Sequence, residues 1–185
     1  PGRREGALHN MAGVLYNGQW LDEYAKQALP NYQVFDEQRY FQPGDTPLVV
    51  EHKGARLGIL ICEDIWQEAP VRQARDAGAD ILVTLNASPY HQNKPAERLE
   101  LLEQRASDVG LPLVYVNQIG GQDELVFDGG SCCVDAEGKL AVQAPHWDIW
   151  LSPVHFVEEQ GKWTPRQGEV DLDVAPEEDL YSALV

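Results

Sequence analysis

The sequence predicts an α/β domain, because short apolar runs alternate with helical patterns along the middle of the chain. Each run has the length and the β-branched content of a buried strand. The runs span residues 57–62, 81–85 and 113–116. Helical patterns fill the two intervals, residues 69–77 and 95–109, and a glycine follows each of them, as expected at the end of a helix. With 185 residues, 43% of them hydrophobic, the chain can bury a sizeable core.

Strand-like segments flank this alternating core. On the N-terminal side, residues 11–16 and 19–26 are separated by Asn17-Gly18, a two-residue signal for a hairpin. On the C-terminal side we expect antiparallel strands. They span residues 125–127, 131–135 and 139–143, with a turn at Glu137-Gly138 between the last two.

The last forty residues lose this periodicity. Prolines punctuate them, which favours a covering loop followed by a linker. Acidic residues outnumber basic ones near the end of the chain, as is typical of a solvated connecting segment. We therefore place a domain at residues 1–155 and an acidic linker at residues 156–185.

Composition excludes several classes of protein. Fourteen Lys and Arg against 30 Asp and Glu give a formal net charge of -16, whereas a nucleic-acid-binding protein needs a basic surface. No apolar run approaches the roughly 18 residues that cross a bilayer, and no signal-peptide pattern is found, so we expect a cytoplasmic protein without membrane association. Three cysteines, two of them adjacent, fit neither a disulfide framework nor a zinc site, so we expect no metal.

Cys62 is the first candidate for chemistry, because it ends a predicted buried strand. A thiol at the C-terminal edge of a strand would be exposed, and N–H groups in the following turn could stabilise an oxyanion. A nucleophilic thiolate also needs a partner. His91 follows another strand end and is a possible base, although no cysteine-protease signature accompanies it. The alternative for Cys62 is a small core residue.

Four segments together resemble the nitrilase (carbon–nitrogen hydrolase) superfamily, and in particular the glutaminase domain of glutamine-dependent NAD synthetases. They are Lys26 with LPNYQVFDEQRYFQPGD (29–45), LGILICEDIW (57–66), LNASPYHQNK (85–94) with Arg98, and VNQIGGQDELVFDGGS (116–131). They cover most of the chain from about residue 16 to residue 135. The resemblance implies a four-layer α-β-β-α sandwich with the site at the strand ends.

The resemblance also implies a catalytic triad of Cys, Glu and Lys. Cys62 matches the nucleophile, and Lys26 matches the lysine whose ammonium stabilises the thiolate and the oxyanion. Glu37 matches an additional carboxylate near that lysine. The triad Glu should precede the lysine on an apolar strand, and neither Glu5 nor Glu23 sits in one. We therefore expect the opening segment of the family to be absent and this chain to be incomplete alone. The alternatives are a solvated Lys26 and a Glu37 exposed in a loop.

As substrate the resemblance implies L-glutamine, hydrolysed through a Cys thioester with release of ammonia. Tyr32 and Glu63 match positions that line the pocket, and Ser88 and Arg98 are candidates to hold the amino-acid head. Each has an alternative without a ligand. Tyr32 could pack at a rim, Ser88 could cap the following segment, and Arg98 could be exposed on a helix.

The partners implied are an NAD synthetase domain and other copies of the chain, as a homo-oligomer. The synthetase domain would use ATP and Mg to amidate nicotinic acid adenine dinucleotide. Its SGGxDS string is absent from the sequence, and the glutaminase step needs no cofactor. Two other interpretations stay open. One is a free-standing amidase such as an ω-amidase, against which the acidic tail counts. The other is a non-catalytic assembly module, which would not need a reactive Cys62.

Overall fold

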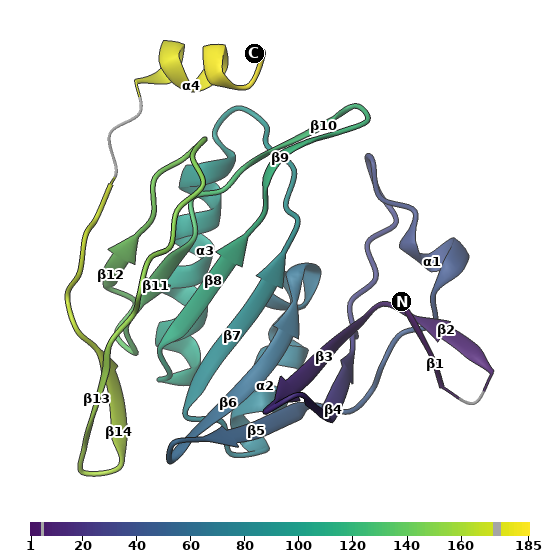
Figure 1. Cartoon of the computed structure of the whole chain (residues 1–185), viewed down its shortest axis with the longest axis vertical. Coiled ribbons are helices and arrows are strands. Elements are labelled where there is room, and N and C mark those ends of the chain that lie inside the picture. The colour runs from purple at the N-terminus through teal and green to yellow at the C-terminus, as the bar shows by residue number, and fades with distance from the viewer. Residues whose placement is uncertain (5, 172–174) are drawn as a thin grey trace. The chain divides into compact units, whose positions relative to one another are not determined.

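A computed structural model describes residues 1–4, 6–171 and 175–185 of the chain (Figure 1). The chain forms two units, residues 1–82 and residues 83–185. The boundary falls inside strand β7 (Ile81–Asn86), one of the strands that the apolar runs predict.

Antiparallel pairing joins the strands of the first unit that precede β7. The pairs are β1 (Gly2–Arg4) with β2 (Ala7–His9), β3 (Met11–Tyr16) with β4 (Gln19–Ala25), and β5 (Leu48–His52) with β6 (Ala55–Ile61). The β3–β4 hairpin confirms the prediction from Asn17-Gly18, since both residues adopt the positive φ that this two-residue turn requires. Strand β6 confirms the first apolar run and ends one residue before Cys62.

Short helical segments follow the strands of the first unit. They are α1 (Glu37–Tyr40), the 3₁₀ turn η1 (Cys62–Trp66) and α2 (Glu68–Asp76). Helix α2 buries Val71 and Ala74, and Gly58 in β6 leaves room for Ala74. A Cβ at Gly58 would lie 3.2 Å from Ala74 Cβ and 2.9 Å from Ala79 Cβ. This close packing fixes the end of β6, where the candidate nucleophile stands.

The second unit is built on a sheet with the strand order β12-β11-β8-β7. Its elements after β7 are α3 (Lys94–Val109), β8 (Leu113–Asn117), β9 (Ile119–Gln122), β10 (Leu125–Asp128), β11 (Cys132–Val134), β12 (Leu140–Gln143), β13 (Phe156–Glu159), β14 (Lys162–Pro165) and α4 (Pro176–Ser182). Strand β11 is antiparallel to both of its neighbours, and β9 pairs with β10 as a hairpin. Helix α3 ends at Gly110, which has a φ of +66°, as predicted. No helix of the described residues is long and apolar enough to span a membrane.

The proline-rich stretch is more ordered than the sequence suggests. Strands β13 and β14 form a hairpin within residues 156–165, where an acidic linker was expected. Val154 and Phe156 pack against a buried cluster that contains Val142. Pro165 closes β14, a place where a strand tolerates proline because no ladder hydrogen bond is needed from it. Part of the expected linker, residues 172–174, lies outside the described residues, so the boundary at residue 155 stays a prediction.

Helix α4 is anchored through a single carboxylate. Asp179 accepts hydrogen bonds from the Tyr90 hydroxyl at 2.6 Å and from the Trp147 indole N–H at 2.7 Å. The two rings meet edge to face with their centroids 4.9 Å apart. Burial, together with the hydrogen bond to Asp179, raises the pKa of Tyr90 to about 12. This end of the chain is therefore docked onto its own unit.

Candidate functional site

Cys62 directly follows β6 and is the first residue of the 3₁₀ turn η1. Its φ of +46° falls in the left-handed region, which residues other than glycine rarely adopt and which commonly marks a functional site. The residue is partly exposed, whereas Cys132 and Cys133 are buried. Burial raises the pKa of both of those thiols to about 12, which makes them poor nucleophiles. Only Cys62 among the three thus combines exposure with a strained strand end, and the core-residue alternative does not fit it.

Lys26 and Glu37 form a largely buried ion pair. Lys26 directly follows β4, and its Nζ donates to Glu37 Oε2 at 2.6 Å while only 3% of the lysine side chain is exposed. Asn10 Nδ2 donates to the other carboxylate oxygen of Glu37 at 2.8 Å, and the Asn10 carbonyl accepts from the Lys26 backbone N–H at 2.9 Å. The structure therefore brings the two predicted residues together. The solvated lysine and the exposed loop acid are both wrong.

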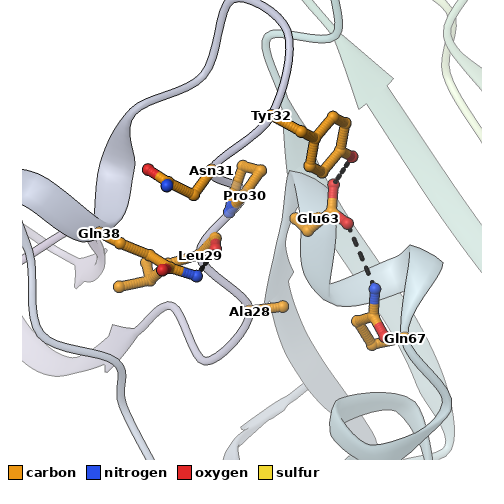
Figure 2. A pocket seen from close by; sticks show the side chains of 8 residues that line it. All are labelled: Ala28, Leu29, Pro30, Asn31, Tyr32, Gln38, Glu63 and Gln67. Atoms are coloured by element: carbon orange, nitrogen blue, oxygen red, sulfur yellow. Dashed lines mark hydrogen bonds between the residues drawn. The ribbon is translucent and has the colours of Figure 1, made fainter.

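Tyr32 and Glu63 meet at a pocket of about 580 Å³ in the first unit (Figure 2). The Tyr32 hydroxyl donates to Glu63 Oε2 at 2.8 Å, and Gln67 Nε2 donates to Glu63 Oε1 at 3.3 Å. Burial and the Glu63 carboxylate raise the pKa of Tyr32, with a further contribution from the charge of nearby Cys62. Glu63 thus presents a mostly buried negative charge to this pocket, directly after the candidate nucleophile.

Arg98 belongs to the second unit and is buried there against a carboxylate. Its Nη1 and Nη2 donate to the two oxygens of Asp128 at 3.0 and 2.8 Å, and Nη1 also donates to the Gly129 carbonyl at 3.2 Å. The guanidinium carbon lies 5.5 Å from the centre of the Tyr115 ring. The interpretation of Arg98 as an exposed helix residue is wrong. Both terminal nitrogens already have acceptors within the protein.

Ser88 is joined to this pair through Asn117. The Ser88 backbone N–H donates to Asn117 Oδ1 at 3.0 Å, and Asn117 Nδ2 donates to the Gly129 carbonyl at 3.0 Å. Ser88 is buried and does not cap α3, whose N-cap is Asn93. The structure therefore places Ser88 and Arg98 in one hydrogen-bonded network of the second unit.

His146 and His91, both in the second unit, differ in their contacts and exposure. His146 Nδ1 lies 3.0 Å from Asp128 Oδ2, so Asp128 is shared between an arginine and a histidine. Burial alone would raise the pKa of Asp128, but the hydrogen bonds from His146 and Arg98 outweigh it and lower that pKa below its usual range. His91, the possible base, has a side chain that is 48% exposed. Its Nε2 lies 3.8 Å from Glu97 Oε2.

Several supporting residues were not predicted as part of the site. Their positions could have been suspected, because polar residues at the ends of buried strands often serve a site. Asn117 ends β8, and Asp128 ends β10. Both lie in the 116–131 segment, to which no roles were assigned. The other supporting residues that were not predicted are Asn10, Gln67 and His146.

The sequence is similar to that of enzymes from several bacteria. The profile of the carbon–nitrogen hydrolase family matches residues 2–154. A glutamine-dependent NAD(+) synthetase of Acinetobacter baylyi is 41% identical over 181 residues, which cover 98% of this chain and 33% of that protein. The synthetase of the same name from Aquifex aeolicus is 47% identical over 138 residues, covering 74% of this chain and 24% of that protein. The chain thus spans about a third or less of the length of these relatives.

Solved structures share its mixed α/β fold. The glutamine-dependent NAD+ synthetase from Acinetobacter baumannii, in complex with ADP, superposes with a TM-score of 0.92 at 38% identity, over 100% of this chain and 35% of that chain. A nitrilase-superfamily amidase from Nesterenkonia AN1 superposes with a TM-score of 0.65 at 30% identity, over 73% of this chain and 50% of that chain. Another structure of that amidase shows covalent addition of an acetamide moiety at its active-site cysteine. With the match over residues 2–154, these similarities show that the chain belongs to the carbon–nitrogen hydrolase family of the nitrilase superfamily.

Proposed function

We propose that this chain is the glutamine-hydrolysing part of a glutamine-dependent NAD synthetase, with Cys62 as the nucleophile. One observation carries the proposal. Cys62 stands in a strained, partly exposed conformation at a strand end, and the next residue, Glu63, turns a buried carboxylate toward the pocket that Tyr32 lines. The similarity to glutamine-dependent NAD synthetases supports the choice of substrate.

The reaction is an acyl transfer in two steps. The Cys62 thiolate forms a C–S bond to the side-chain carbonyl of glutamine, the C–N bond breaks, and the nitrogen takes a proton and leaves as ammonia. Water then hydrolyses the thioester, which yields glutamate and restores the thiol. The ammonium of Lys26 stabilises the thiolate and the developing oxyanion, and Glu37 holds that ammonium in place.

Recognition of the amino-acid head follows from charge. The Glu63 carboxylate, with Tyr32 and Gln67 donating to it, attracts the α-ammonium of glutamine. Ser88 is proposed to contact the α-carboxylate. Arg98 is proposed to share this contact, and it also supports Ser88 through Asp128 and Asn117.

The proposal also covers the residue that transfers the proton and the remainder of the whole protein. Proton transfer to the leaving ammonia requires a general acid. The resemblance assigns this role to a Glu, which would first take the thiol proton as a general base and then pass it to the nitrogen. Glu23 is paired with Arg4 at 3.0 Å, and Glu5 lies outside the described residues. In the whole protein, ammonia would pass to an NAD synthetase domain that uses ATP and Mg. The four-layer sandwich and the homo-oligomer belong to the same proposal.

Protection from alkylation tests this function. L-Glutamine should slow the reaction of iodoacetamide with Cys62, followed by peptide mass spectrometry, whereas D-glutamine and simple amides should not. Glu63→Gln should weaken the protection about tenfold or more, since it removes the charge that faces the α-ammonium, while the unprotected rate stays similar. Equal protection by acetamide and glutamine would instead favour a free-standing amidase. Gln38→Glu, at the same pocket but away from Glu63, serves as the matched control.

A further inference from the structure

Asp64, two residues after Cys62, is fully buried and accepts four hydrogen bonds. Its Oδ1 accepts from the backbone N–H groups of Gln27 at 3.0 Å and Ala28 at 2.7 Å. Its Oδ2 accepts from the Tyr24 hydroxyl at 2.9 Å and from the Ile61 backbone N–H at 2.9 Å. Three of these partners are backbone N–H groups, which can only donate, and the fourth is a hydroxyl that donates to an ionised carboxylate.

The hydrogen-bond partners of Asp64, together with Asp64 itself, lie close in sequence to Lys26 and Cys62, the two residues of the proposed chemistry. Tyr24, Gln27 and Ala28 lie on either side of Lys26 in the sequence, and Ile61 and Asp64 itself lie on either side of Cys62. One rigid side chain thus ties the end of β4 to the turn after β6. The ammonium of Lys26 is held separately, by its hydrogen bond to the Glu37 carboxylate.

We infer that Asp64 is a positioning residue that sets the placement of the Lys26 ammonium relative to the Cys62 thiol. The inference rests on the proposed function of those two residues. Asp64 touches neither substrate nor reacting atoms in this account and acts through the backbone on both sides. Burial raises the pKa of Asp64, while the hydrogen bonds from Ala28 and Ile61 act in the opposite direction. The position therefore holds a carboxylate at the cost of desolvation, which a residue of purely space-filling function would not require.

Asparagine at this position could not replace the carboxylate. It has one acceptor oxygen, and its NH₂ group would face donors. Asp64→Asn should therefore lose the hydrogen bonds on one side, either those from the backbone of residues 27 and 28 or those from Tyr24 and Ile61. A misplacement of about 1 Å between reacting groups can slow a reaction on the order of 100-fold, so we expect alkylation of Cys62 to slow by about 10- to 100-fold.

The test is a double-mutant cycle between Asp64→Asn and Lys26→Met. The rate constant for iodoacetamide at Cys62 is measured by peptide mass spectrometry on protein shown to be folded by circular dichroism. If Asp64 acts through Lys26, Lys26→Met slows the reaction in the wild-type background and has little further effect in the Asp64→Asn background. If the two effects simply multiply, the inference is overturned. Tyr24→Phe removes only one of the four hydrogen bonds and replaces Asp64→Asn in the cycle should that variant not fold.

Two comparisons separate this inference from its premises. Asp80→Asn removes a carboxylate of the same unit that accepts three hydrogen bonds from Arg56, and it should leave the rate at Cys62 unchanged. Iodoacetamide carries no amino-acid head, so the cycle reads the thiol without relying on glutamine recognition. A Lys26→Met substitution without effect in the wild-type background would contradict the proposed function itself. If the effects of Asp64→Asn and Lys26→Met on the rate multiply, only the role of Asp64 is contradicted.

Discussion

Replacing Asp128 by alanine is expected to lower the free energy of unfolding by about 3–5 kcal/mol, because it leaves the buried Arg98 charge without its carboxylate counter-charge. Arg98 and Asp128 are both almost completely buried, and His146 and Asn117 also depend on the Asp128 carboxylate. Urea denaturation followed by circular dichroism measures the change. A loss below about 1 kcal/mol, the range of exposed ion pairs, would contradict this account.

The same carboxylate predicts a dependence on pH. The pKa of Asp128 is lower in the folded protein than in the unfolded chain, so its contribution to stability is fully present above the unfolded pKa of about 3.9. That contribution is lost as the pH falls through the lower, folded pKa. The stability difference between wild type and Asp128→Ala should therefore shrink in acid below about pH 4. Glu97→Ala removes a half-exposed carboxylate near His91 and is the matched control, with an expected loss under about 1 kcal/mol.

Replacing Lys26 by methionine is expected to slow acylation of Cys62 by a glutamine analogue about 100- to 1,000-fold. Methionine keeps the length of the side chain but removes the cation that we propose stabilises the thiolate and the oxyanion, and loss of one such stabilising group has effects of this size. The rate of covalent addition, measured by intact mass over time, gives the ratio.

The control for this effect is Lys139→Met, which removes an exposed lysine of the second unit. It should leave the rate within a factor of about two, since the charge of an exposed side chain is screened by solvent and salt. If both variants slow the reaction equally, the loss reflects net charge and not the Lys26 ammonium, and the assignment of Lys26 fails.

Local signals in the sequence predict much of the fold. The Asn17-Gly18 turn, the run that becomes β6 and the helix ended by Gly110 are each determined by neighbouring residues, through backbone conformation and periodicity. The hairpin β13–β14 was missed because its strands are short and its order depends on packing against Val142, a residue distant in sequence.

The candidate site was predicted through resemblance more than through periodicity. A lysine after a strand and a glutamate at the start of a short helix give no local sign that they will pair across 11 residues, as Lys26 and Glu37 do. The partner of Arg98 lies 30 residues away, and no spacing rule connects the two. Such contacts form only when the chain folds, so no local pattern predicts that Arg98 is buried against Asp128.

The measurement that tests the central claim most directly is the intact mass after treatment with 6-diazo-5-oxo-L-norleucine, a glutamine-like alkylating agent. Our account predicts a single adduct on the folded protein and its loss in Cys62→Ala. That result would show that the nucleophile and the recognition of a glutamine-like head are both present. No adduct on a folded sample, or an adduct that persists in Cys62→Ala, would contradict the claim and favour a non-catalytic assembly module.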